Sequence, residues 1–248
     1  MSVGPVAAVR DYFRFVAAIG RSVQREGLSW SASVKAAWDI GVESMPILLV
    51  IAGFIGSNLS LQGHAAFAPL GAQRMLGMFV SLAGVRELAP IIAGSMVAAK
   101  AGTQMASQLG VMRIQEQLDA LEVMAVDPLA HLVAPRLAGI MLALPALVIV
   151  ATFTMIAAAY AAAVMQLGVG GATFLRFAAD GVQPIDFAYG EVKGAVFGAV
   201  ICTVSCWYGF HCGSGPEGVG RATNQAVVTS AVLCVVLNYL LSEVMYGG

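Results

Sequence analysis

Two adjacent charged residues, Arg86 and Glu87, stand in the middle of a strongly apolar stretch of the sequence. A charge at the centre of a membrane-spanning helix costs about 3 kcal/mol on insertion scales. Neighbouring side chains on a helix point about 100° apart, so these two residues do not simply neutralise each other. Each of them must therefore face a partner, a polar cavity or a ligand.

Pro90 lies four residues after Arg86 and adds a second constraint. Proline lacks the N–H that would bond the carbonyl four residues earlier, so the carbonyl of Arg86 loses its helical partner and the helix kinks there. Two interpretations follow. The charges form an inter-helix ion pair that only holds a bundle together, or they form a polar floor or gate for the headgroup of a substrate, which we favour.

The composition indicates which elements must hold these charges. Of 248 residues, 59% are hydrophobic and only 11% are charged, and the mean hydropathy is +0.83. Soluble domains carry about 25% charged residues. We therefore predict an all-α integral membrane protein, because helices satisfy their own backbone groups inside a bilayer. The formal net charge of −1 gives no indication of a nucleic-acid partner.

Five apolar runs approach or exceed the roughly 20 residues that a spanning helix needs. They are residues 44–62, 75–99, 137–165, 191–210 and 222–241. Residues 1–40 precede them as an N-terminal interfacial segment, and residues 5–23 within it have the apolar and arginine-rich faces of an amphipathic helix. The alternative is a helix packed on a partner subunit. We predict a single domain over residues 1–248, with no separate soluble part.

The distribution of basic residues predicts the orientation of the chain. With the N-terminus in the cytoplasm and five crossings, nine basic residues fall inside and two outside. The inner set is Arg10, Arg14, Arg21, Arg25, Lys35, Lys100, Arg113, Arg136 and Arg221, and the outer set is Arg74 and Arg176. Cytoplasmic loops carry the excess of Lys and Arg, so the C-terminus is expected outside. The outer loop 166–190 is expected to be partly helical or to dip into the membrane interface.

The long cytoplasmic connection 101–135 contains a segment, residues 113–125, with strong helix formers and no Gly or Pro. Its apolar residues recur at helical spacing and give one stripe. They are Ile114, Leu118, Leu121 and Met124. Its acidic residues, spaced three apart on another flank, are Glu116, Asp119 and Glu122, and Asp127 with Pro128 ends the segment. Such a helix either fills a groove on a partner or packs as an ordinary interfacial helix under the bundle.

Other patterns in the chain predict little chemistry. There is no Gly-x-x-x-x-Gly-Lys-Ser/Thr phosphate loop. The glycine-rich segment 213–223 is better explained as a tight connector than as a phosphate-binding loop. Two of the four cysteines lie in an apolar run without zinc-site spacing, so no metal, cofactor or disulfide is predicted.

Several segments of the sequence resemble the MlaE (YrbE) permease family. The matching segments are residues 85–90 (VRELAP), 116–129 (EQLDALEVMAVDPL), 135–136, 218–228 (GVGRATNQAVV), 54–56 and 59–63. The resemblance runs from the first span to the end of the chain, and the acidic segment is its most specific motif. The N-terminal segment matches poorly.

The resemblance implies a permease subunit of an ATP-driven ABC lipid transporter in the bacterial inner membrane. It implies a homodimer with two cytoplasmic ATPase subunits, which would bind the ATP, and an MCE-domain protein on the outer side. In some systems of the family a STAS-domain protein binds the ATPase. The cargo would be phospholipid moved between inner and outer membranes, or a fatty acid or sterol in actinobacterial relatives.

The resemblance also assigns residues. The positions that would line the lipid cavity are Arg86, Glu87, Leu88, Leu59 and Leu70. Residues 113–125 would be the coupling helix, and the residues that would contact the ATPase are Arg113, Glu116, Asp119, Glu122 and Asp127. The alternative function is an ion- or proton-coupled secondary transporter or channel that uses Arg86 and Glu87. An intramembrane enzyme is disfavoured because no paired ligands fall at mid-membrane.

Overall fold

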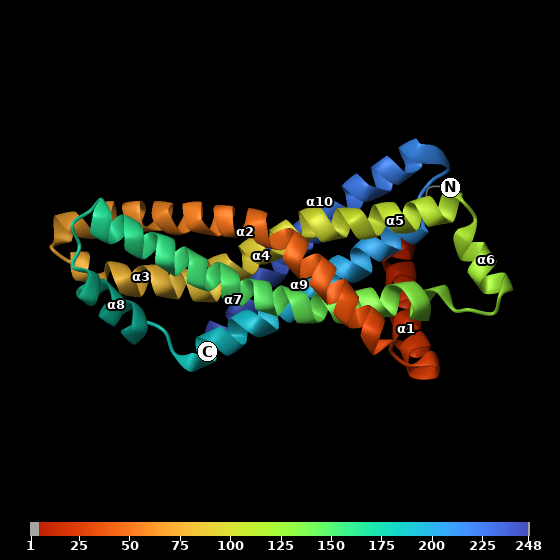
Figure 1. Cartoon of the computed structure of the whole chain (residues 1–248), viewed down its shortest axis with the longest axis horizontal. Coiled ribbons are helices and arrows are strands. Elements are labelled where there is room, and N and C mark those ends of the chain that lie inside the picture. The colour runs from red at the N-terminus through yellow and green to blue at the C-terminus, as the bar shows by residue number, and fades with distance from the viewer. Residues whose placement is uncertain (1–4, 248) are drawn as a thin grey trace. The chain divides into compact units, whose positions relative to one another are not determined.

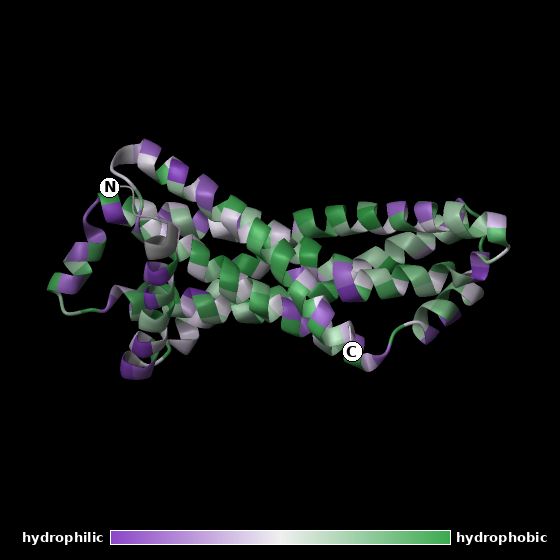
Figure 2. Cartoon of the chain, turned by 180° about the vertical axis from the view of Figure 1, so that it is seen from behind, coloured by the Kyte–Doolittle hydropathy of each residue, from purple (hydrophilic) through white to green (hydrophobic). Residues whose placement is uncertain are grey.

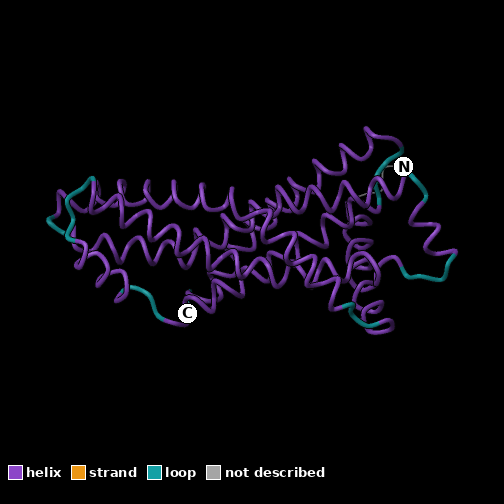
Figure 3. The backbone as a smooth tube through the Cα atoms, in the orientation of Figure 1, coloured by secondary structure: helices purple, strands orange, loops and turns teal. Residues whose placement is uncertain are grey.

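The computed structural model describes residues 5–247, and residues 1–4 and 248 lie outside the described part. The predicted segment 1–40 therefore begins outside the described residues. Helices and short connections make up all of residues 5–247, with no strand among them (Figure 3). The prediction of an all-α membrane protein is confirmed.

Ten α-helices occur in the described residues (Figure 1). They are α1 (Pro5–Glu26), α2 (Trp30–Phe67), α3 (Leu76–Ala83), α4 (Ala89–Val97), α5 (Thr103–Ile114), α6 (Gln117–Val123), α7 (Ala134–Met165), α8 (Gly171–Asp180), α9 (Pro184–Phe210) and α10 (Gly215–Tyr246). Short 3-10 or π-helical segments join several of them: η1 (Ala68–Leu70), η2 (Gln73–Met75), η3 (Gly84–Leu88), η4 (Ala98–Gly102) and η5 (Leu129–Val133).

Five stretches of continuous helix in the described residues are long and apolar enough to cross a membrane. They are Trp30–Leu70, Gln73–Ile114, Leu129–Met165, Pro184–Phe210 and Gly215–Tyr246. Each contains one of the predicted runs and extends beyond it at one or both ends. Hydropathy marks only the part of a helix that suits hydrocarbon, whereas helical geometry continues into the polar flanks. Figure 2 shows this pattern, with hydrophobic residues along the long helices and hydrophilic residues mainly toward their ends.

We predicted one N-terminal interfacial segment over residues 1–40, but the described part of this segment belongs to two helices. Helix α1 ends at Glu26, and the next residue, Gly27, has a left-handed φ of 79° and donates its N–H to the carbonyl of Val23. Glycine adopts this conformation without steric cost and so stops helices. Helix α2 then begins at Trp30, and residues 30–40 belong to the first spanning helix.

The chain forms two compact units, each with parts of all five long stretches. Unit 1 comprises residues 1–40, 97–143 and 198–233. In it the apolar face of α1 packs on α9: the Tyr12 hydroxyl is 2.8 Å from that of Thr203, and the Phe15 ring packs edge-on against Trp207 and Phe210. The chain's own α9 thus covers this face, which we had considered for a partner subunit.

Unit 2 comprises residues 41–96, 144–197 and 234–248. Its core includes a cluster in which α8 packs beside α3 and α7 (Figure 1). Phe174 of α8 is fully buried there against Tyr160 of α7. A Cβ at Gly77 would overlap the backbone oxygen of Phe174, so only glycine allows α3 and α8 to approach this closely. The predicted outer loop 166–190 therefore contains a packed helix.

Candidate substrate site and partner-facing helix

The charged pair Arg86 and Glu87 lies in the π-helical segment η3, inside the second long stretch of helix. In η3 the N–H of Ala89 bonds the carbonyl of Gly84, five residues earlier. Pro90 provides no N–H, as the sequence indicated, and the carbonyl of Arg86 accepts a hydrogen bond from Lys193 Nζ at 2.6 Å. Single π-helical turns of this kind occur often at functional sites.

Arg86 pairs with Asp186, a residue in the first turn of α9. Arg86 Nε lies 2.9 Å from Asp186 Oδ1, and the Asp186 side chain is only 1% exposed. The other oxygen of Asp186, Oδ2, accepts a hydrogen bond from the backbone N–H of Gln183 at 2.8 Å. An acidic residue is favourable at a helix N-terminus, so Asp186 both caps α9 and fixes the guanidinium.

Glu87 has a different set of partners. Its Oε1 accepts hydrogen bonds from Lys193 Nζ at 3.1 Å and from the Ser242 hydroxyl at 2.6 Å, and its Oε2 accepts one from Asn238 Nδ2 at 2.6 Å. The Lys193 side chain is fully buried. Thus η3, α9 and α10 each contribute polar groups to one cluster in unit 2.

A cavity of about 350 Å³ opens beside this cluster. Arg86 and Glu87 line it together with a second carboxylate, that of Glu243, and with apolar and aromatic residues such as Leu82, Tyr239 and Tyr246. The guanidinium carbon of Arg86 lies 4.5 Å from the centre of the Tyr246 ring, a cation–π contact. The Arg86 side chain remains 33% exposed, so part of the guanidinium is available to a ligand.

The two ion pairs of this cluster, Arg86 with Asp186 and Lys193 with Glu87, have no net charge. Two cations and two carboxylates meet within the spanning helices, which removes most of the cost of placing each of them there. Arg86 and Glu87 thus take part in inter-helix pairs, as the first interpretation requires. They also line a cavity, and its use for a substrate headgroup stays a prediction. Arg86 is the cation among the residues that line the cavity, and a partly exposed arginine beside aromatic and aliphatic side chains can contact the anionic group of an amphiphile.

The leucines assigned to the same cavity do not all meet there. Leu88 is half-buried in η3 next to the charged pair. Leu59 lines a separate hollow with Phe54, Ile55 and Asn58, and it packs on the core cluster around Phe174. Leu70 ends η1 and is 76% exposed. The structure thus places Leu59 in a different cavity from Arg86.

The segment predicted as one coupling helix is broken in the structure. Helix α5 ends at Ile114, Glu116 adopts a left-handed φ of 58°, and the short helix α6 covers only Gln117–Val123. Arg113 therefore lies in the last turn of α5. Its Nη1 lies 2.6 Å from Asp119 Oδ1 and ties α6 to α5.

The surface of α6 combines acidic and apolar groups. Leu118 is buried and anchors the helix, whereas Val123 and Met124 are 88% and 64% exposed. Glu116 and Glu122 are exposed as well. Asp127 differs from the other assigned residues, because its Oδ1 accepts the backbone N–H of Leu129 at 2.9 Å and caps the next helical segment. In this structure Asp127 therefore stabilises the start of the helical segment that follows it.

Sequence reasoning missed Asp186, Lys193, Asn238 and Ser242. Lys193 lies at the edge of a predicted span and Asp186 in a predicted loop, and a search for countercharges near the spans would have found both. The glycine-rich segment 213–223, which we interpreted as a tight connector, is largely the start of α10, which begins at Gly215.

These features define a class: a multi-pass helical membrane protein with a paired charged cluster and a cavity among its spanning helices. The family model described as Permease MlaE matches residues 33–244, so the chain belongs to the MlaE permease family.

Curated relatives agree with this assignment. A probable ABC transporter permease protein of Rickettsia bellii is 35% identical over 91% of the chain and 87% of the relative. The intermembrane phospholipid transport system permease protein MlaE of Haemophilus influenzae is 30% identical over 97% and 95% of the two chains. The chloroplastic protein TRIGALACTOSYLDIACYLGLYCEROL 1 of Arabidopsis thaliana is 31% identical over 89% and 63%.

Proposed function

We propose that this chain is the permease subunit of an ATP-driven ABC transporter that moves phospholipid between the inner and outer bacterial membranes. The observation that carries the proposal is the partly exposed Arg86 on a cavity within the spanning helices. Membership of the MlaE permease family supports it, as does the phospholipid transport named for the Haemophilus relative. The family match favours this function over an ion-coupled secondary transporter.

The chain itself would not be an enzyme. Its sequence has no phosphate loop for ATP, so a separate cytoplasmic ATPase would supply the energy. The further partners proposed are a second copy of the permease, an MCE-domain protein on the outer side and, in some systems, a STAS-domain protein. The proposed location is the inner membrane with the N-terminus in the cytoplasm.

Arg86 is the residue that would contact the headgroup. Asp186 holds Nε of its guanidinium, and the rest of the fork can donate to a phosphate on the cavity side. Lys193 is saturated by Glu87, Ser242 and the carbonyl of Arg86, so it would position η3 rather than bind lipid.

The test removes the charge of Arg86 together with that of its partner. In Arg86→Gln with Asp186→Asn the pair is neutral on both sides, so assembly should survive. The exposed donors for a phosphate would be weakened, and we expect lipid that co-purifies with the transporter, and lipid transport, to fall by about tenfold or more. Mass spectrometry of bound lipid and transport into acceptor vesicles measure both.

A matched control neutralises an ion pair away from the site. Arg176 and Asp180 form an exposed pair on α8 with a separation of 3.9 Å. The double variant Arg176→Gln with Asp180→Asn should bind and transport lipid normally. Wild-type lipid binding and transport in the Arg86 double variant would show that Arg86 only balances Asp186.

A further inference from the structure

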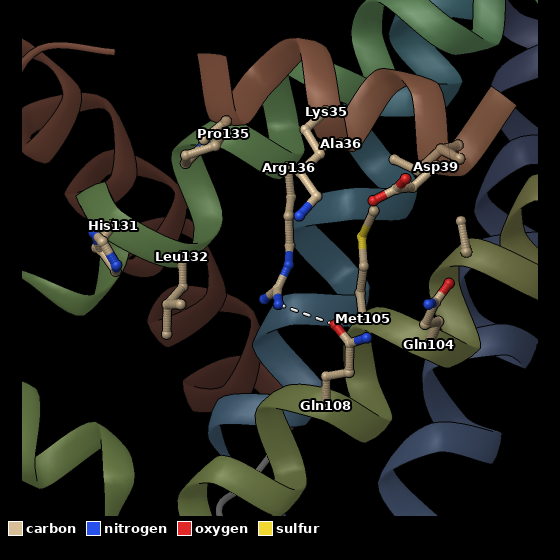
Figure 4. A pocket seen from close by; sticks show the side chains of 13 residues that line it. Lys35, Ala36, Asp39, Gln104, Met105, Gln108, His131, Leu132, Pro135 and Arg136 are labelled. Carbon is tan, nitrogen blue, oxygen red and sulfur yellow. Dashed lines mark hydrogen bonds between the residues drawn. The ribbon is translucent and has the colours of Figure 1, made fainter. Parts of the chain in front are cut away.

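Unit 1 contains a second cavity with charged walls, of about 270 Å³ (Figure 4). It lies between the beginning of α2, the start of α5 and the junction of η5 with α7. None of its lining residues belongs to unit 2, which holds the Arg86 cluster. The function proposed above does not use this cavity.

Close packing of α2 on α7 builds one wall. A Cβ at Gly139 of α7 would lie 2.8 Å from both the Cβ of Ala36 and the backbone N of Ala37. This approach brings Arg136, one turn before Gly139, close to Lys35 and Asp39 on α2, and all three line the cavity. Figure 4 shows Arg136 extended across the cavity toward Gln108 of α5.

The guanidinium of Arg136 is only partly satisfied. Its Nη2 donates to Gln108 Oε1 at 3.0 Å, while its Nη1 is buried and makes no hydrogen bond to the described residues. Leaving a buried charged donor unpaired is costly, so an acceptor that fills the cavity would be stabilised there.

The charges around the cavity specify the acceptor. Lys35 and Arg136 are cationic and Asp39 is anionic, which leaves one net positive charge among these lining residues. A singly charged anion would neutralise it. Phosphate-type oxygens match the planar fork of arginine and the point charge of lysine.

The uncharged part of the wall combines the polar side chains of Gln104, Gln108 and His131 with an apolar surface, to which Ile40, Met105, Leu132 and Pro135 contribute. A free inorganic anion would leave this surface unused, whereas an amphiphile would cover it. The volume is below the roughly 300–1,000 Å³ typical of pockets that enclose a whole small molecule, so it suits a headgroup with its chains outside.

We infer that this cavity binds the phosphodiester headgroup of a membrane lipid, at a site separate from the Arg86 cavity. Arg136 and Lys35 hold the phosphate, and the apolar wall contacts the glycerol and the first carbons of the chains. The inference does not depend on which cargo the Arg86 cavity carries.

The experiment uses the full chain in a maltoside detergent and phosphate-free buffer. Native mass spectrometry follows the binding of dihexanoyl-phosphatidylglycerol, of dihexanoylglycerol without a phosphate, and of inorganic phosphate. We expect Arg136→Gln and Lys35→Gln each to weaken binding of the phospholipid about tenfold in an Arg86→Gln/Asp186→Asn background, where the Arg86 cavity contributes least. Arg221→Gln, which removes an exposed arginine of the same unit, should change nothing.

Two results would overturn the inference. If inorganic phosphate binds as tightly as the phospholipid and both depend on Arg136, the cavity is a site for a soluble anion. If Arg136→Gln and Lys35→Gln bind the phospholipid like the Arg86→Gln/Asp186→Asn parent, or if dihexanoylglycerol binds equally well, no headgroup site exists here. Should Arg136→Gln fail to fold, Lys35→Gln decides between these results, because Lys35 is exposed and its loss leaves the packing intact.

Discussion

Lys193 is the residue on which the charged cluster of unit 2 depends most. Its ammonium group contacts three oxygens, those of the Arg86 carbonyl, the Glu87 carboxylate and the Ser242 hydroxyl, at 2.6 to 3.1 Å. A lysine has three N–H donors, so the buried group is fully satisfied. It replaces the hydrogen bond that Pro90 removes and neutralises Glu87 at the same time.

Replacing Lys193 with Met should therefore destabilise the protein. The change keeps the length of the side chain but leaves Glu87 without its cation and the Arg86 carbonyl without a donor. We expect a loss of about 3 kcal/mol, at the low end of the range for a buried pair because the Glu87 side chain is 39% exposed. Thermal unfolding in detergent, followed by the loss of monodisperse protein, measures it.

The companion variant carries Glu87→Gln as well as Lys193→Met. It removes the orphaned carboxylate and should recover part of the lost stability. Equal unfolding temperatures for wild type, single and double variants would contradict the importance given to this pair.

The residues of this cluster show what can be predicted from sequence at this scale. Arg86 and Glu87 were identifiable because a charge inside an apolar run is costly, and the freed carbonyl followed from Pro90. Their partners were not, because Lys193 and Glu87 are separated by 106 positions and only tertiary packing brings them together. The sequence required countercharges but did not specify which acid or base would supply them.

At the scale of elements, the segment 113–125 shows where pattern reasoning is weakest. Its helix formers predicted one continuous helix, yet Glu116 and Ala125 have left-handed φ angles of 58° and 59° and bound α6 on either side. Non-glycine residues adopt this conformation uncommonly, so no propensity scale indicates it. The buried Leu118 and the Arg113–Asp119 contact are tertiary features that accompany the break.

The proposed coupling role of α6 can be tested with Glu116→Lys and Asp119→Lys together. Both side chains are exposed, and exposed ion pairs contribute about 0–1 kcal/mol, so the unfolding temperature should change little. We expect ATP hydrolysis to become independent of lipid transport, because the variant reverses the charge of the surface that would meet the ATPase. ATPase and transport assays on the reconstituted complex measure the two activities.

A control with the same change of charge is Asp180→Lys with Glu217→Lys, whose side chains are 69% and 85% exposed. This control should keep both activities coupled. Normal assembly and transport in the α6 variant would refute the coupling assignment.

Glycines at helix contacts allow a second test at this scale. A Cβ at Gly77 would overlap the backbone oxygen of Phe174, whereas a Cβ at Gly20 of α1 would meet nothing within 4 Å. Gly77→Ala should therefore destabilise unit 2 by about 1–3 kcal/mol through overpacking. Gly20→Ala should be neutral or stabilising by up to about 1 kcal/mol, because alanine is the better helix former. Similar unfolding temperatures for the two variants would argue against the close contact of α3 with α8.

For the whole molecule, the number of spanning helices followed from the sequence because the bilayer imposes a simple length requirement on apolar runs. The extent of the helices did not follow, since polar flanks remain helical when they pack on neighbouring helices. Helix α8 is a different case. It lies in the connection 166–190, which was expected to be partly helical, but its place is set by contacts of Phe174 with α3 and α7 that hydropathy does not detect.

The orientation of the chain remains a prediction for the whole molecule. Nine basic residues on one side of five crossings and two on the other place the N-terminus in the cytoplasm and the C-terminus outside. Single cysteines at Gly247, Ala125 and Leu175, all of them exposed, can test this in a background without the native cysteines. Cys212 must be replaced even though burial raises the pKa of its thiol, against a smaller opposing effect of Arg113, because slow labelling there would still add background.

The labelling reagent is a membrane-impermeant maleimide applied to cells whose outer membrane has been removed. Cysteines at Gly247 and Leu175 should react at once, because five crossings put the C-terminus and α8 on the outer side. The cysteine at Ala125 should react only after the inner membrane is permeabilised, because α6 is expected in the cytoplasm beside the ATPase. Three crossings are predicted between Ala125 and Gly247, so labelling of both positions from the same side would contradict the predicted topology. If Ala125 alone is accessible from outside, the orientation is inverted and α6 cannot contact a cytoplasmic ATPase.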